Sequence, residues 1–280
     1  MANDSPPRHV LTWPEANVRM AFRQIPAGSF EMGSRGRESD EEPVHRVQIT
    51  QDFWMAETPV TQAQFAIWTR AEYVEHKNHF ANRPTHPAEN MDWHQTVAYC
   101  QWLTRTKAGQ FPPGFELACL PTEARWEYTC RAGTDTDYHT GDGEDALGKA
   151  GCYGEEWDSG STHPVAQKTP NMFLLYDMHG NVLEWCQDNW DDNAYRQRPD
   201  GVRDPLIVGG EDLLRVLRGG SWSYSANRCR SARRDWYDAD YCSWLIGFRV
   251  CLVRSPADSS KRSGEGVGAR ETERPRDEGA

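Results

Sequence analysis

The sequence contains no apolar run of about 18 residues, the length that a membrane-spanning helix needs, and so it predicts no membrane insertion. Its beginning, MANDSPPRHVLTWPEAN, has no basic segment followed by an apolar one, as a secretory signal would. Basic residues are not in excess either, because the formal net charge is -11 at pH 7. Binding to a phosphate backbone needs a basic face, so nucleic acid is not an expected partner. Together these absences favour a cytoplasmic protein.

Common catalytic and metal-binding signatures are also missing. None of the eight cysteines forms a CxxC pair or a spacing suited to a zinc knuckle. The sequence has no HExxH helix, no complete phosphate-binding loop and no Gly-x-Ser-x-Gly nucleophile elbow. In a reducing compartment we expect most of these cysteines to be buried thiols that act as small apolar side chains.

Aliphatic side chains are sparse, but the chain has 12 Trp, 10 Tyr and 9 Phe. This balance predicts a core built on aromatic rings rather than on layers of Leu, Ile and Val. A chain of 280 residues is long for one domain, yet an irregular α+β domain can reach this length, and we expect a single large one. The expected architecture is loop-rich, with short antiparallel strands and a few helices.

Local patterns predict the first elements of this architecture. Alternating apolar residues indicate strands that form a hairpin between residues 18 and 32. Capping boxes that begin at Thr61 and Asp92 predict helices over residues 61–70 and 92–107. The first half of the chain is therefore expected to alternate between short strands and capped helices.

A third helix, capped by Thr122, should follow a short strand ending at Leu120 and should end before Gly133. Residues 134–162 are rich in Gly, Asp and Thr and predict a long irregular insertion.

The chain should divide into three parts. Residues 1–18 predict a flexible N-terminal arm, and residues 19–254 form the expected α+β domain. Residues 255–280 contain no aromatic residue and are dominated by Ser, Gly, Glu and Arg, so they predict a disordered tail.

The most unusual stretch covers residues 215–253. Its centre, residues 222–244, holds three Trp, three Tyr, four Ser, four Arg and three Asp, with almost no aliphatic side chains. Such a composition is typical of recognition surfaces, because Trp and Tyr give large contact area at low entropic cost and Ser and Asn give adaptable hydrogen bonds. The apolar flanks at 214–217 and 245–253 are expected to be the scaffold.

Seven motifs, in this order, resemble the formylglycine-generating enzyme family, also called the sulfatase-modifying factor family. The resemblance implies a variant of the C-type lectin fold and covers about residues 23–253. Its glycines before Ser221 and Phe248 are expected to permit backbone turns that a Cβ would obstruct. The motifs are Phe30-Glu31-Met32-Gly33, Glu42-Pro43-Val44-His45, Thr58-Pro59-Val60-Thr61, the segment 120–128 (LPTEARWEY), the segment 180–185 (GNVLEW), the segment 218–222 (RGGSW) and Gly247-Phe248-Arg249.

The resemblance implies a copper site that this chain does not complete. The enzymes oxidise a substrate cysteine with oxygen, using copper held by two thiolates three and eight residues after the serine of the Gly-Gly-Ser turn. Counting from Ser221, those positions are Tyr224 and Cys229. A phenol does not replace a thiolate for Cu(I), so copper is not expected. Residues 228–233 also fit an alignment with a later structural cysteine, and in either alignment at most one of the two thiols remains.

The resemblance further implies a calcium-binding turn. Its ligand positions correspond to Asp177, Gly180, Val182 and Glu184, which would offer two carboxylates and two backbone carbonyls. The alternative is that Asp177 and Glu184 only stabilise the turn.

The sequence leads to a first hypothesis of a non-catalytic binding protein. It resembles the variable proteins of diversity-generating retroelements, some of which use this fold and concentrate substitutions just before the Gly-Phe-Arg strand. The expected ligand is a protein or a carbohydrate. The candidate ligand-binding residues are Ser223, Tyr224, Ser225, Asn227, Arg228, Arg234, Asp235, Trp236, Tyr237, Asp238, Asp240, Tyr241, Ser243 and Trp244.

Three alternatives stay open at the level of sequence. The first is an oxidoreductase that acts on thiols through Cys229, with Cys242 as a candidate partner. In the second, residues 222–244 are ordinary loop residues of a family member. The third is an accessory module of a signalling or conflict system.

Overall fold

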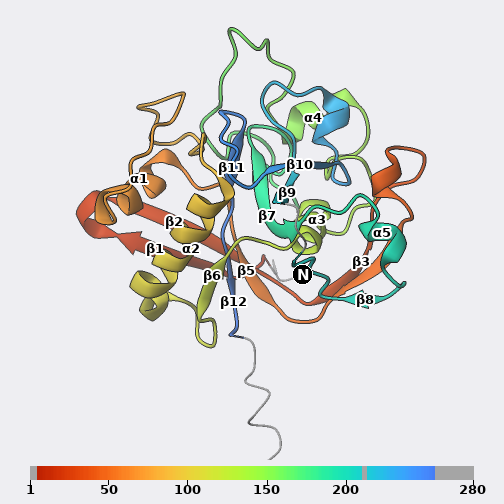
Figure 1. Cartoon of the computed structure of the whole chain (residues 1–280), viewed down its shortest axis with the longest axis horizontal. Helices are drawn as coiled ribbons and strands as arrows, with labels where there is room; N and C mark the ends of the chain where they lie inside the picture. The colour runs from red at the N-terminus through yellow and green to blue at the C-terminus, as the bar shows by residue number, and fades with distance from the viewer. Residues whose placement is uncertain (1–4, 210–212, 256–280) are drawn as a thin grey trace, which may run out of the picture.

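The computed structural model describes residues 5–209 and 213–255 (Figure 1). Short strands and helices alternate along the chain, which confirms the α+β class. The strands are β1 (Arg8–Trp13), β2 (Val18–Ile25), β3 (Gly28–Met32), β4 (His45–Ile49), β5 (Phe53–Ala56), β6 (Leu117–Cys119), β7 (Leu183–Asn189), β8 (Val202–Arg203), β9 (Leu214–Arg218), β10 (Arg234–Asp238), β11 (Ile246–Phe248) and β12 (Cys251–Val253). The helices are α1 (Gln62–Ala71), α2 (Trp93–Lys107), α3 (Glu123–Arg131), α4 (Glu144–Ala150) and α5 (Ala194–Gln197), with 3-10 turns at Pro14–Ala16, Ser39–Glu41, Ala108–Gln110 and Ala226–Cys229.

The strands form three sheets. One has five strands in the order β1-β2-β5-β12-β6, a second has four in the order β10-β9-β7-β11, and a third has three in the order β3-β4-β8. The last two strands of the chain enter different sheets, because β11 pairs in parallel with β7 whereas β12 lies between β5 and β6. The segment after residue 245 therefore ties the four-stranded sheet to the five-stranded one.

The prediction of a flexible arm over residues 1–18 is wrong for the part that the structure describes. Residues 8–13 form β1, which pairs antiparallel with β2 along its whole length. Leu11 and Trp13 are buried, so the strand contributes to the core. The alternation of apolar residues in RHVLTW carries the signal, but the neighbouring Pro, Asn and Asp residues conceal it. The prediction of a disordered tail over residues 255–280 lies outside the described residues, except for Ser255.

The predicted hairpin between residues 18 and 32 is also wrong. Strand β2 pairs with β1 and β5, whereas β3 pairs with β4 in another sheet. Pro26 and Ala27 separate the two strands and redirect the chain. A proline cannot donate to a strand ladder, and here it marks a change of sheet rather than a turn within one.

The three helix predictions are confirmed. In α1 the Thr61 hydroxyl accepts from Gln64 N at 3.3 Å and the Gln64 side chain accepts from Thr61 N at 2.9 Å. Asp92 and Gln95 form the same capping box at α2, and Thr122 caps α3. The predicted irregular insertion over 134–162 contains one short helix, α4.

The core is aromatic, as predicted. Trp126, Trp185 and Trp222 are fully buried. Around them, rings meet mostly edge to face, for example Phe65 with Phe248 at 5.9 Å and Tyr99 with Phe248 at 5.3 Å between centroids. Edge-to-face contacts of this kind stabilise a core beyond simple burial. None of the helices in the described part of the chain combines the length and apolarity that crossing a bilayer requires.

Among the described residues, four arginine side chains are also fully buried, which the sequence patterns do not predict. A buried guanidinium is stable only when carboxylates and carbonyl oxygens satisfy it. Each of the four has at least one carboxylate partner, and all of these carboxylates lie more than 60 residues away in the sequence. The pairs are Arg218 with Glu123 and Glu127, Arg230 with Glu41, Arg234 with Glu123, and Arg249 with Glu184.

Candidate functional site

The frame of residues 222–244 is set by a glycine turn at one end and by Gly247, inside strand β11, at the other. Gly219 and Gly220, which follow β9, have φ of +97° and +74°. A Cβ on Gly220 would lie 2.5 Å from Cys229 Sγ, and one on Gly247 would lie 2.7 Å from Ala88 O. Gly219 and Gly220 therefore form the predicted turn, which requires glycine. The predicted turn at Gly247 is wrong, because Gly247 lies inside strand β11, where glycine is required by the close approach of Ala88 O. The polar and aromatic segment between these glycines is held at both ends by buried strands.

Strand β10 divides the predicted surface into two faces. Successive side chains of a strand point to opposite sides, so Arg234 and Trp236 share one side and Asp235 and Tyr237 the other. Trp236 is 45% exposed and its ring lies 6.2 Å from that of Trp190. The aromatic residues of 222–244 therefore do not form one continuous patch.

Tyr237 belongs to the second face. Its ring stacks on that of Tyr241 at 4.4 Å, with 17° between the planes. Tyr224 lies on the same side and is half-buried, with the guanidinium carbon of Arg228 3.8 Å above its ring. Arg228 Nη2 also donates to Asp235 Oδ1 at 2.9 Å. Burial and the nearby Asp235 raise the pKa of Tyr224, so its phenol stays protonated at neutral pH.

Trp244 anchors an aromatic cluster next to this face. Its ring meets Trp157 edge to face at 4.9 Å, stacks with Phe80 at 5.9 Å and contacts His79 at 3.8 Å. Trp157 is 55% exposed and comes from the loop after α4, the green loop in Figure 1. The fully buried Trp222 forms the floor, 6.4 Å from Trp244. Sequence reasoning missed Trp157, His79 and Phe80, because they lie far from residues 222–244 in the chain.

Two backbone hydrogen bonds hold the Trp157 loop in place. Gly154 N donates to Tyr224 O at 2.9 Å, and Glu155 N donates to Trp222 O at 3.0 Å. The loop therefore extends the surface formed by residues 222–244. We call Tyr224, Tyr237, Tyr241, Trp157 and Trp244 the aromatic surface.

Most predicted ligand-binding residues are accessible, with one exception. Arg234 is buried, and its Nε donates to Glu123 Oε1 at 2.6 Å, so its prediction as a surface residue is wrong. Its guanidinium reaches Glu123, the first residue of α3, whereas Trp236 on the same side of β10 is exposed. The exposed residues are Ser225, Asn227, Trp236, Asp238, Asp240 and Tyr241, and the half-buried ones are Ser223, Tyr224, Arg228, Asp235, Tyr237, Ser243 and Trp244.

The donors around Cys229 do not fit a copper ion. The Cys229 thiol is buried beside Ser221 O, and burial raises its pKa to about 12. A copper site needs a thiolate pair, but the other position is Tyr224. Cys242 is exposed, and all eight cysteines are free thiols, six of them buried. The structure therefore does not pair Cys229 with Cys242.

Asp177 and Glu184 lie in a buried cluster whose positive charge comes from Arg249. Arg249 Nη2 donates to Glu184 Oε1 at 2.7 Å and Arg249 Nε to Oε2 at 3.0 Å, while Trp126 Nε1 donates to Oε2 at 2.8 Å. Asp177 Oδ2 accepts from Ala166 N at 2.7 Å, and burial raises the pKa of Asp177. Asp177 Oδ1 is buried and has no partner among the described residues.

This donor set does not fit calcium. The ion takes six to eight oxygen ligands, and here Glu184 is already committed to a guanidinium. Gly180 and Val182, the other predicted ligands, would supply only carbonyls. Gly180 instead serves a close approach, since a Cβ there would lie 2.0 Å from Cys152 O. Within the described ranges, no group of three or more His, Cys, Asp or Glu side chains is arranged to hold a metal. Calcium stays a prediction, and the geometry argues against it.

The geometry defines an α+β domain in which a glycine turn after β9 and the glycine-containing strand β11 frame a polar, aromatic surface. The chain belongs to the family of the sulfatase-modifying factor enzyme 1-like domain, which matches residues 14–254. Treponema denticola variable protein 1 has a similar structure, with a TM-score of 0.74 and 26% identity over 89% of this chain and 99% of that one. PvdO from Pseudomonas aeruginosa is similar at a TM-score of 0.76 and 26% identity, with the same coverage. The predicted C-type lectin-like fold is thereby confirmed.

Two curated relatives differ in how much of them this chain covers. The formylglycine-generating enzyme of Streptomyces coelicolor is 29% identical, and the match covers 89% of this chain and 95% of the enzyme. The serine/threonine-protein kinase pkn1 of Chlamydia pneumoniae is 27% identical over 249 residues, covering 80% of this chain but only 36% of the kinase. The chain therefore spans about a third of that kinase.

Proposed function

We propose that this protein is a non-catalytic binding protein whose residues 222–244, together with Trp157, form the recognition surface. The observation that carries the proposal is the replacement of a thiolate pair by Tyr224 and a buried Cys229. Burial raises the pKa of Cys229 to about 12, so the thiol stays protonated at neutral pH. A protonated, enclosed thiol is a poor nucleophile and a poor ligand for a soft metal.

The exposed side chains support binding through aromatic and polar contacts. Trp157 is 55% exposed and Tyr241 42%, although the Trp157 loop is held by two backbone hydrogen bonds and the Tyr241 ring stacks on that of Tyr237. Exposed rings on a rigid frame are typical of binding hot spots, because little conformational entropy is lost when a partner covers them. Ser225 and Asn227 add exposed groups that can form hydrogen bonds. A protein or a carbohydrate is the ligand class that this surface suits.

The surface is also proposed to be diversified, as in retroelement variable proteins. The solved variable protein of Treponema denticola, at 26% identity and a TM-score of 0.74, supports this finer reading. The test is genomic. A near-copy of the codons for residues 215–253, differing chiefly at adenines and lying beside a reverse-transcriptase gene, is expected. A genome without such a copy would contradict the proposed diversification, and only the proposed binding function would stand.

Binding itself is tested with purified protein on arrays of surface proteins and glycans. Tyr241→Ala should abolish any specific signal, because Tyr241 is exposed and stacks on Tyr237 in the aromatic surface. Tyr73→Ala is the matched control, since Tyr73 is 95% exposed and lies just after α1, outside residues 222–244. Equal losses in both variants would contradict the proposed surface.

A thiol oxidoreductase is the second candidate, favoured by the formylglycine-generating enzyme that covers 89% of this chain. It predicts oxygen consumption with a cysteine-containing peptide and copper, dependent on Cys229. Oxidation above that of a Cys229→Ala variant would favour the enzyme over the binding protein.

We further propose that the protein acts in a reducing compartment such as the cytoplasm. All eight cysteines are free thiols, and six are buried as small apolar side chains. Formation of disulfides on secretion would need these buried thiols to become exposed. A fusion protein recovered from an oxidising compartment with intact native fold and new disulfides would contradict this location.

A further inference from the structure

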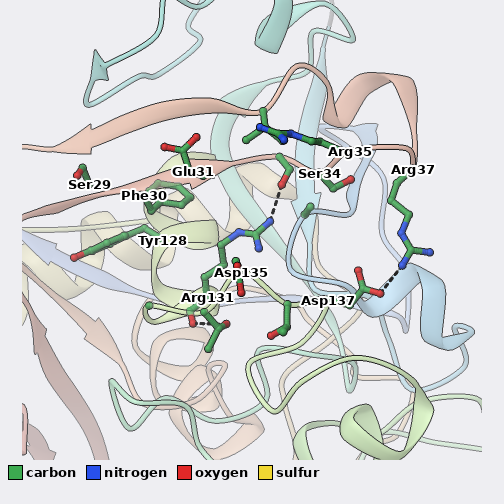
Figure 2. Close-up of a pocket in the computed structure, with 16 residues that line it drawn as sticks. Ser29, Phe30, Glu31, Ser34, Arg35, Arg37, Tyr128, Arg131, Asp135 and Asp137 are labelled. Atoms are coloured by element: carbon green, nitrogen blue, oxygen red, sulfur yellow. Dashed lines mark hydrogen bonds and ion pairs between the residues drawn. The ribbon is translucent and has the colours of Figure 1, made fainter.

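A cleft of about 770 Å3 opens between β3, the end of α3 and the loop that follows this helix (Figure 2). One side is aromatic, with the Phe30 ring 5.4 Å from the Tyr128 ring. The opposite side carries Asp135 and Asp137. None of these side chains belongs to the aromatic surface. Cavities of this size commonly hold small organic ligands, so the cleft is a candidate second binding site.

Arg131 is built into this cleft as a fixed cation. Its side chain is 7% exposed, its Nε donates to Glu127 Oε1 at 2.9 Å and its Nη2 donates to Gly33 O at 2.8 Å. The remaining nitrogen, Nη1, has no partner in the described part of the chain. Figure 2 shows Arg131 between the aromatic side and the acidic loop. A guanidinium held rigidly by two contacts, with one nitrogen free, is well suited to bind a carboxylate.

The other charges of the cleft include both signs. Arg37 Nη2 and Asp137 Oδ2 are 2.7 Å apart and neutralise each other. Arg35, Glu31 and Asp135 are exposed and have no ion-pair partner among the described residues. A singly charged ligand would satisfy one sign and leave the other without a partner. A zwitterion satisfies both, which favours it over a simple anion or cation.

We propose that this cleft binds a free α-amino acid with a flat apolar side chain. The carboxylate of the ligand accepts from Arg131 Nη1, and its ammonium group faces the Asp135 carboxylate. The side chain lies on the rings of Phe30 and Tyr128. This assigns the cleft a ligand class separate from that of the aromatic surface, and it does not depend on the proposed function.

Three probes with the same ring separate the contributions. L-phenylalanine carries both charges, 3-phenylpropionate only the carboxylate and 2-phenylethylamine only the ammonium group. Isothermal titration with the full chain should show phenylalanine binding at least about tenfold more tightly than either of the others, because each lost charge removes a charge-assisted contact. Equal affinity for the three probes, or no binding of phenylalanine at millimolar concentration, would overturn the proposal.

Variants locate the site. Asp135→Asn should weaken phenylalanine about tenfold and leave phenylpropionate unchanged, since phenylpropionate has no ammonium group for Asp135. Asp158→Asn, an exposed carboxylate beside Trp157, is the matched control and should change neither affinity. Arg131→Lys should weaken both phenylalanine and phenylpropionate, with circular dichroism checking its fold. Because Asp135 is exposed and has no partner to lose, an unchanged phenylalanine affinity in Asp135→Asn contradicts the assignment even if Arg131→Lys does not fold.

Discussion

Two sets of side chains from residues 215–253 differ in where they lie. Arg218, Arg230 and Arg234 are essentially fully buried, whereas Trp236 and Tyr241 are 45% and 42% exposed. Side-chain polarity alone would predict the opposite arrangement. What decides it is the facing element: Glu41 and the carboxylates of α3 lie where the arginines point. The arginines thus fix the frame, and the rings are left for contact with a partner.

The largest expected effect comes from breaking the buried network. Arg218→Met leaves Glu123 and Glu127 without their shared guanidinium, and we expect the free energy of unfolding to fall by about 3–5 kcal/mol. Urea unfolding followed by circular dichroism measures it. Arg233→Met is the matched control and should cost less than about 1 kcal/mol, because one of its partners, Glu38, is 47% exposed and the other, Asp235, keeps its ion pair with Arg228. Similar losses of stability in the two variants would contradict the claim that the buried arginines fix the frame.

Aromatic residues of the same stretch should differ just as clearly in how much they contribute to the free energy of unfolding. Trp222 is fully buried beneath Trp157 and Trp244, so Trp222→Ala should cost about 3–5 kcal/mol. Tyr241→Ala should cost less than about 1 kcal/mol, since its ring is 42% exposed. The same urea titration checks both. A large loss in Tyr241→Ala would make this residue part of the scaffold instead.

A smaller effect is expected from pH. Burial, reinforced by Glu123, raises the pKa of Asp188 to about 7, so the folded state binds its proton more tightly than the unfolded state does. Protonation of Asp188 therefore contributes to the free energy of unfolding. This contribution is fully present below about pH 4, the pKa of an Asp in the unfolded chain, and is lost as the pH rises through about 7. In the unmodified protein, the free energy of unfolding should fall by on the order of 2 kcal/mol between pH 5 and 8, and Asp188→Asn should remove this fall. Parallel stability curves for the two proteins would show that Asp188 ionises normally.

The smallest effect should come from calcium. Because Arg249 already neutralises Glu184, adding millimolar calcium or a chelator should change the free energy of unfolding by less than about 0.5 kcal/mol. Thermal melts in both conditions measure it. A stabilisation that grows with calcium concentration and disappears in Asp177→Asn would show that the turn binds the ion after all.

Sequence alone predicts the features that depend on neighbours in the chain. The caps at Thr61, Asp92 and Thr122 and the glycines before Ser221 each need only a few adjacent residues, and each is confirmed. The family resemblance then supplies the fold.

Features that depend on distant partners escape local patterns. Arg234 looks like a surface residue until Glu123, 111 residues earlier, is placed behind it. Trp157 joins the aromatic surface only because its loop binds the backbone of Tyr224 and Trp222. For β10, the two-residue alternation already placed Arg234 and Trp236 on one side, but it did not show that Arg234 is buried there and Trp236 exposed.

The central claim is that the exposed rings serve recognition and that Cys229 does not catalyse. The most direct test is oxygen consumption with copper and a cysteine-containing peptide, measured for the unmodified chain and Cys229→Ala. Equal, background rates are predicted, because Cys229 is buried with a pKa of about 12 and Tyr224 cannot supply the second thiolate. Peptide oxidation in the unmodified chain that disappears in Cys229→Ala would contradict the claim and identify an enzyme.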